Sequence, residues 1–106
     1  MSKGGDFNAL VALLDPEVTF RPDATAVRMG APSARRGSAA VAGEFFGRAQ
    51  GARPALAGGL SGLAWAPEGQ VRGVFAFAIA DGLIFDIELI TDQTRISELD
   101  VVLLDA

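Results

Sequence analysis

The sequence predicts an α+β fold, in which two to three helices pack against a curved, mainly antiparallel sheet. Two amphipathic helical patterns lie in the first half of the chain, and strand patterns fill the second half from residue 53 to residue 90. A chain of 106 residues has room for one hydrophobic core. We therefore expect a single domain over residues 1–106.

The N-terminal pattern predicts a helix followed by a strand. Apolar residues recur at i, i+3, i+4 and i+7 over residues 7–14, and Asp6 can cap the start of this helix. Pro16 ends it, because the residue before a proline is pushed out of the α region. Residues 17–22 alternate between apolar and polar side chains, which predicts a short half-buried strand with Phe20 on its buried face.

A second helix is expected after an irregular connection. The connection covers residues 22–37 and could include a short strand around residues 26–29. Ser38 is a suitable cap for a helix over about residues 39–49, which would bury Phe45.

Four strands and a final helical turn complete the prediction. The strands are expected at residues 53–57, 63–66, 71–80 and 83–90. Asp81-Gly82 favours a two-residue type I′ hairpin, because both central residues of that turn need positive φ. Asp92 or its neighbour Thr91 can cap a helical turn that runs to Leu99.

The hairpin raises the question of what two acids do in an apolar strand. Counting outward from the turn without interruption places Phe85 opposite Ala78 and Asp86 opposite Phe77. One face of the hairpin is then wholly apolar, with Val74, Ala76, Ala78, Ala80, Leu83, Phe85, Ile87 and Leu89. The other face holds Phe75, Phe77, Ile79, Ile84, Asp86, Glu88 and Ile90.

Unpaired carboxylates are costly to bury, so we expect Asp86 and Glu88 on an outer or subunit-facing surface. Two alternatives stay open: a paired-carboxylate acid-base site, and ion pairs with arginines such as Arg53 or Arg72. The choice separates an enzyme from a binding or regulatory domain.

The residue types that are absent restrict the chemistry. The chain has no His, Cys or Tyr, so acid-base and nucleophilic groups are limited mainly to Asp, Glu, Ser and Thr, and zinc, copper and haem lose their common ligands. We expect no catalytic residue, no metal and no cofactor. The formal net charge of −4 argues against direct nucleic-acid binding. Without a membrane-spanning run or a signal pattern, the expected compartment is the cytoplasm.

Four segments that together cover nearly the whole chain resemble a known family. They are GDFNALVALLDPEVTFRPD, RRGSAAVAGEFF, RPALAGGLSGLAWAPEGQVRGVFAFAIADGLIFDIELI and TDQTRISELD. Their order resembles the SnoaL-like family, which shares its cone-shaped fold with nuclear transport factor 2 and ketosteroid isomerase. Within it, the chain is most similar to the C-terminal SnoaL-like domain of extracytoplasmic-function sigma factors of the SigJ type. The resemblance implies a mixed sheet that forms a cone, part of the usual first helix missing, and a homodimer through the sheet.

The resemblance also implies partners. Sigma-factor domains of this type often carry Asp-Gly-Gly-Gly-Lys after the first strand and Asn-Pro-Asp-Lys-Leu after the last, and both segments are implicated in contact with the DNA-binding sigma regions. This chain keeps only Asp23 of the first segment. In the second, Asp92 stands at the first position, and the basic Arg95 and apolar Ile96 are retained. These three residues are the expected contacts with sigma regions or RNA polymerase.

The catalytic members of the family place a His and an Asp of the last strands inside the cone. The matching residues here are Ile87 and Leu89, which cannot accept a proton. The resemblance therefore implies an apolar pocket, with Asp23 as its remaining candidate carboxylate, although a turn role is the alternative for Asp23 and a core role for Trp65. The candidate pocket residues are Phe20, Asp23, Phe45, Trp65, Ala76, Phe85, Ile87 and Leu89.

Three functions remain as hypotheses, and the first is favoured. The chain could be a non-catalytic regulatory domain that acts by protein contact, a stand-alone protein that binds a small apolar ligand, or a cyclase- or isomerase-like enzyme. The second predicts an open apolar cavity. The third predicts an acid in that cavity with a raised pKa.

Overall fold

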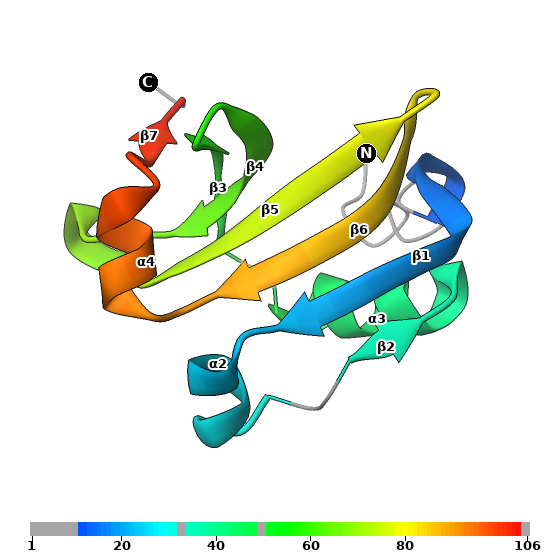
Figure 1. Ribbon diagram of the computed structural model, residues 1–106, viewed down its shortest axis with the longest axis horizontal. Helices are drawn as coiled ribbons and strands as arrows, with labels where there is room; N and C mark the ends of the chain where they lie inside the picture. The colour runs from blue at the N-terminus through cyan, green and yellow to red at the C-terminus, as the bar shows by residue number, and fades with distance from the viewer. Residues whose placement is uncertain (1–10, 32–33, 49–50, 105–106) are drawn as a thin grey trace.

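The computed structural model describes residues 11–31, 34–48 and 51–104. It is an α+β structure built on one seven-stranded mixed sheet with the order β2-β1-β6-β5-β4-β3-β7 (Figure 1). Neighbouring strands are antiparallel except for β1 and β6, which are parallel. The elements are β1 (Leu14–Pro22), α2 (Ala24–Arg28), β2 (Arg35–Arg36), α3 (Ser38–Arg48), β3 (Arg53–Ala57), β4 (Leu60–Trp65), the 3-10 turn η2 (Pro67–Gly69), β5 (Gly73–Ala80), β6 (Leu83–Ile90), α4 (Gln93–Glu98) and β7 (Val102–Leu103).

Most of the predicted elements are confirmed, and their bounds differ in places. The strands β3 and β6 have the predicted limits, and α3 begins at Ser38, so that Ser38 is its first residue and not the cap that precedes it. The first strand begins earlier than expected, at Leu14, while β4 begins at Leu60 and β5 at Gly73. The short β7 was not predicted. The start of the expected first helix, residues 7–10, lies outside the described residues.

The expected strand at residues 26–29 is wrong, because this segment forms the helix α2. Asp23 precedes the helix in an extended conformation, and its side chain accepts a hydrogen bond from the backbone N–H of Ala26 at 2.8 Å. This N-cap satisfies one of the free N–H groups of the first turn. The sequence indicated a turn role for Asp23, but it did not lead us to expect that a helix begins directly after this residue.

The hairpin turn is confirmed, but its predicted register holds for only two residue pairs. Asp81 and Gly82 have φ values of 53° and 78°, as a type I′ turn requires. The pairs next to the turn are the predicted ones, but Ala78 then faces Asp86 instead of Phe85. Phe85 is therefore an extra residue in β6, which forms a β-bulge.

The bulge corrects the predicted assignment of faces. A shift of one residue moves side chains to the opposite side of a strand. Ile87 and Leu89 consequently share a face with Phe75 rather than with Ala76, and the wholly apolar face predicted by uninterrupted counting does not exist. We call the side of the sheet that packs against α3 the inner face, and the opposite side the outer face.

Each face of the sheet carries its own core cluster. The larger one fills the inner face beneath α3 and includes Leu14, Val18, Phe20, Ala26, Val41, Ala42, Phe45, Phe75, Ile84, Ile87 and Leu89. The smaller one lies on the outer face beneath α4 and consists of Ala57, Val74, Ile90 and Ile96. Figure 1 shows α3 near β1 and β2, and α4 at the other end of the long β5–β6 hairpin. No described helix has the length and apolar character needed to cross a membrane.

Candidate functional site

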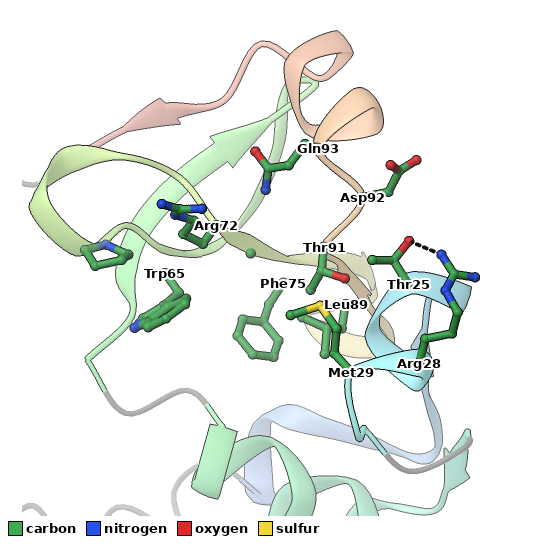
Figure 2. Close-up of a pocket in the computed structure, with 12 residues that line it drawn as sticks. Thr25, Arg28, Met29, Trp65, Arg72, Phe75, Leu89, Thr91, Asp92 and Gln93 are labelled. Carbon is green, nitrogen blue, oxygen red and sulfur yellow. Dashed lines mark hydrogen bonds between the residues drawn. The ribbon is translucent and has the colours of Figure 1, made fainter.

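The candidate site is an open cleft of about 910 Å³ at one end of the sheet. Its walls come from α2, from the connection between β4 and β5, and from the loop between β6 and α4 (Figure 2). Trp65, Phe75 and Leu89 form its apolar floor on the inner face, and Met29 adds a thioether from the end of α2. The cleft is thus lined by apolar side chains at its base and polar ones at its rim.

The floor of the cleft contains one buried aromatic ring, that of Phe75, and one half-exposed ring, that of Trp65. Phe75 is 3% exposed, and its ring meets that of Phe45 edge-on at 5.1 Å between centroids. Trp65, by contrast, is 49% exposed although it projects from the same face of the sheet. A large aromatic side chain that remains half exposed beside a buried one is a typical base for an apolar ligand.

Two arginines stand at the rim of the cleft. The Arg28 guanidinium donates to Thr25 Oγ1 at 3.1 Å, and that of Arg72 donates to Gln70 Oε1 at 3.4 Å. Among the described residues, neither arginine has a carboxylate partner within 4.0 Å. Asp92 is the acid of the rim.

Asp23 lies behind the cleft and joins two of its walls. Besides capping α2, its carboxylate accepts hydrogen bonds from Thr91 N at 2.9 Å, Thr91 Oγ1 at 3.1 Å and Asp92 N at 3.1 Å. Burial by itself would raise the pKa of Asp23, but the hydrogen bonds from Ala26, Thr91 and Asp92 outweigh it and leave the pKa below its usual value. The carboxylate therefore holds the loop and the helix in place as an anion.

The acids of β6 form an ion network on the outer face. The Arg21 guanidinium donates to both oxygens of Asp86 at 2.8 Å, and Thr19 Oγ1 donates to the same carboxylate at 2.6 Å. Arg95 donates to Glu88 at 2.9 Å. Burial tends to raise the pKa of Asp86, but the bonds from Arg21 and Thr19 lower it below its usual value. The outer position of the acids is confirmed, and their cationic partners are not the two arginines named from the sequence.

The structure brings two of the eight predicted pocket residues, Trp65 and Leu89, into the cleft. The others lie elsewhere: Phe20, Phe45 and Ile87 in the inner core, Ala76 on the outer face, Phe85 at the bulge with 44% of its surface exposed, and Asp23 behind the wall. Sequence reasoning missed Met29, Arg28, Arg72 and Phe75 as lining residues. Phe75 was missed because the undetected bulge assigned it to the wrong face.

The three expected partner-contact residues are also separated. Asp92 lines the cleft, and Arg95 joins the outer ion network. Ile96 is only 7% exposed and packs in the outer core, so its side chain is not available at the surface. Asp92 and Arg95 are thus accessible at the surface, whereas Ile96 anchors the segment in the outer core.

Comparisons with known proteins place the fold. No family model matches the sequence, and no curated protein matches it significantly. The crystal structure of the Mycobacterium tuberculosis extracytoplasmic-function sigma factor SigJ is similar over 92% of this chain, at 26% identity and a TM-score of 0.67. This chain spans about 40% of the length of that SigJ chain.

Two further structures share the fold at lower identity. TerC, co-crystallised with polyporic acid, is 15% identical over 92% of this chain and 87% of its own, with a TM-score of 0.54. An NTF2-like protein of unknown function from Burkholderia pseudomallei is 16% identical over 91% of this chain and 86% of its own, with a TM-score of 0.52. The resemblance seen in the sequence is confirmed, and the protein has the SnoaL-like, NTF2-like fold.

Proposed function

We propose that this chain is a non-catalytic regulatory domain that acts by contact with the DNA-binding regions of an extracytoplasmic-function sigma factor, or with RNA polymerase. The observation that carries the proposal is the likeness to SigJ, at 26% identity over 92% of this chain. The other two structures, at 15% and 16% identity, support the fold alone. Such a role would place the domain in the cytoplasm.

The state of the carboxylates supports a role without chemistry. A general base or acid in a pocket needs a pKa near the working pH, which for a carboxyl group means a raised value. The pKa values of Asp23 and Asp86 are lowered instead, and both groups already accept several hydrogen bonds. A cyclase- or isomerase-like reaction is therefore the least supported of the three hypotheses.

The proposed contact surface includes Asp92 and Arg95, on the segment that follows β6. Because Arg95 is held by Glu88 and the N–H of Asp92 by Asp23, the segment is fixed before any partner arrives. Prepositioned groups lose less conformational entropy on binding. Ile96 would support this surface from below, through the outer core.

The test is a binding measurement with purified sigma regions 2 and 4, taken from the sigma factor encoded in the same reading frame or next to it. We expect binding by biolayer interferometry, and a loss of about tenfold, or about 1.4 kcal/mol, for Asp92→Lys. Glu17→Lys makes the same charge change at an exposed site on β1 and should bind as the unchanged protein does. Absence of binding, or equal weakening by both variants, would contradict the proposal.

A homodimer through the sheet is a further expectation of this role. Phe85, the extra residue of the bulge, is 44% exposed. A large apolar side chain exposed on a sheet is a candidate contact for a second copy of the chain. Sedimentation equilibrium should then show a dimer that Phe85→Asp dissociates.

The cleft favours a second candidate function, the binding of a small apolar ligand. The specific observation is the half-exposed Trp65 on a floor shared with Phe75 and Leu89. The two functions are compatible, because a regulatory domain can also bind a ligand.

A further inference from the structure

We propose that the cleft binds a small, flat aromatic molecule that carries an anionic group. Its ring system would lie against Trp65 and Phe75, and its anionic group would pair with the guanidinium of Arg72. This inference rests on the second candidate function and names the class of ligand.

The shape of the apolar part favours a flat ligand. Trp65 is 49% exposed and Met29 is 74% exposed, and Figure 2 shows these two side chains on either side of Phe75. Phe75 and Leu89 at the base are almost fully buried, so the floor does not need to rearrange. An aromatic ring placed between Trp65 and Met29 would bury apolar surface on both, and it could stack on the indole.

The position of Arg72 links the apolar floor to a charge. Its backbone N–H donates to the carbonyl oxygen of Trp65 at 2.8 Å, which fixes the start of β5 beside the indole-bearing residue. Figure 2 shows the Arg72 side chain and the amide of Gln93 on the polar side of the cleft, above Phe75. A bound ring would therefore have a guanidinium and an amide donor at one edge.

The guanidinium groups of the cleft favour an anion. Its described lining has two arginines, Arg28 and Arg72, and one acid, Asp92, while the anionic Asp23 behind the wall is already bonded to Thr91 and Asp92. Neither guanidinium is paired with a carboxylate among the described residues. A guanidinium binds carboxylate, sulfonate or phosphate oxygens through two parallel N–H donors, whereas a cationic ligand would be repelled.

The chain supplies its own reporter for a test. Trp65 is its single tryptophan, so quenching of its fluorescence reports binding of a probe, and the Arg72 variant localises that binding to the cleft. Two probes share one aromatic skeleton: 8-anilinonaphthalene-1-sulfonate carries a sulfonate, and N-phenyl-1-naphthylamine is neutral. We expect the sulfonate probe to quench Trp65 at concentrations about tenfold lower than the neutral probe, since one charge-assisted pair contributes about 1.4 kcal/mol.

A variant separates the charge from the apolar surface. Arg72→Gln should weaken the sulfonate probe about tenfold and change the affinity of the neutral probe less than about twofold. Arg36→Gln removes a mostly exposed arginine on β2, outside the cleft, and should change neither affinity. Far-ultraviolet circular dichroism of each variant establishes that the fold is retained.

Each other outcome overturns the inference in a recognisable way. If the probes bind equally well, or if Arg72→Gln weakens both alike, the anionic group is wrong and the apolar ligand remains. If neither probe quenches Trp65, the ligand-binding function fails together with the inference. The proposed contact with sigma regions is measured separately and is unaffected by either result.

Discussion

The two faces of the β5–β6 hairpin use different interactions although they belong to the same two strands. On the inner face, Phe75, Ile87 and Leu89 are buried against α3 and its neighbours. On the outer face, Asp86 and Glu88 are paired with arginines. The difference shows that the presence of an acid in an apolar strand can be explained by a cationic residue on a neighbouring segment of the same face.

The strand β1 supplies the polar partners of Asp86 on the outer face. It runs parallel to β6, with Thr19 beside Asp86 and Arg21 beside Glu88. Because strand side chains alternate, the buried Phe20 between them faces inward while the hydroxyl and the guanidinium face the acids. A pairing between distant segments therefore accounts for the position of the acids in an otherwise apolar strand.

The largest expected effect comes from comparing two phenylalanines that face different surroundings. Phe20→Ala should lower the free energy of unfolding by about 3–5 kcal/mol, because it empties a fully buried site. Phe85→Ala should cost less than about 1 kcal/mol, because the bulge leaves that ring 44% exposed. Urea denaturation followed by circular dichroism measures both. Both variants are compared at protein concentrations where the chain is monomeric, and similar losses there would contradict the exposed position of Phe85 at the bulge.

The fold class was predictable because local signals agree with the final structure. The hairpin turn, the limits of β6 and the start of α3 near Ser38 follow from residue types within a few positions of one another. The cleft was less predictable, because its walls come from α2, β4–β5 and β6–α4, which meet only through the sheet. The bulge has no strong residue signature, and one inserted residue was enough to misplace Phe75.

A tight approach on the outer face gives the next prediction. A Cβ at Gly62 would lie 2.1 Å from the carbonyl oxygen of Phe75, so Gly62→Ala must push β4 away from β5. We expect a loss of about 3 kcal/mol in unfolding free energy, as in other overpacked sites. Gly43→Ala is the matched control, because its added Cβ in α3 meets nothing within 4 Å beyond the backbone of its own helix. That variant should gain about 0.5–1 kcal/mol from helix propensity, and a loss there would contradict the comparison.

The carboxylate behind the cleft should show an intermediate effect. Asp23→Asn replaces an oxygen that accepts hydrogen bonds with an amide that donates, next to the N–H groups of Thr91 and Asp92. We expect a loss of about 2 kcal/mol at pH 7 in denaturant titrations. Asp92→Asn is the control, since that side chain makes no capping hydrogen bond, and it should change stability by less than about 0.5 kcal/mol.

The effect of Asp23→Asn on stability should depend on pH, and the sign of this dependence follows from the lowered pKa of Asp23. The pKa of Asp23 is lower in the folded state than the value of 3.8 expected for the unfolded chain. Its stabilising contribution is therefore complete above that value and is lost as the pH falls through the folded pKa. The difference between the unchanged protein and Asp23→Asn should shrink as the pH is lowered through this range. A constant difference would show that hydrogen bonding to the ionised carboxylate is not the cause.

The smallest expected effect is the coupling of Arg21 with Asp86 on the outer face. A double-mutant cycle with Arg21→Gln and Asp86→Asn should give about 0.5–1 kcal/mol, because Arg21 is 54% exposed and water screens the pair despite its two 2.8 Å bonds. The pKa of Asp86 is lowered below its ordinary value of 3.8, so the coupling should be present at pH 7 and be lost as the pH falls through the folded pKa. Added salt should reduce it as well. A coupling of several kcal/mol that resists salt would mean that this face is shielded from water, and sedimentation would then be expected to show it inside a dimer.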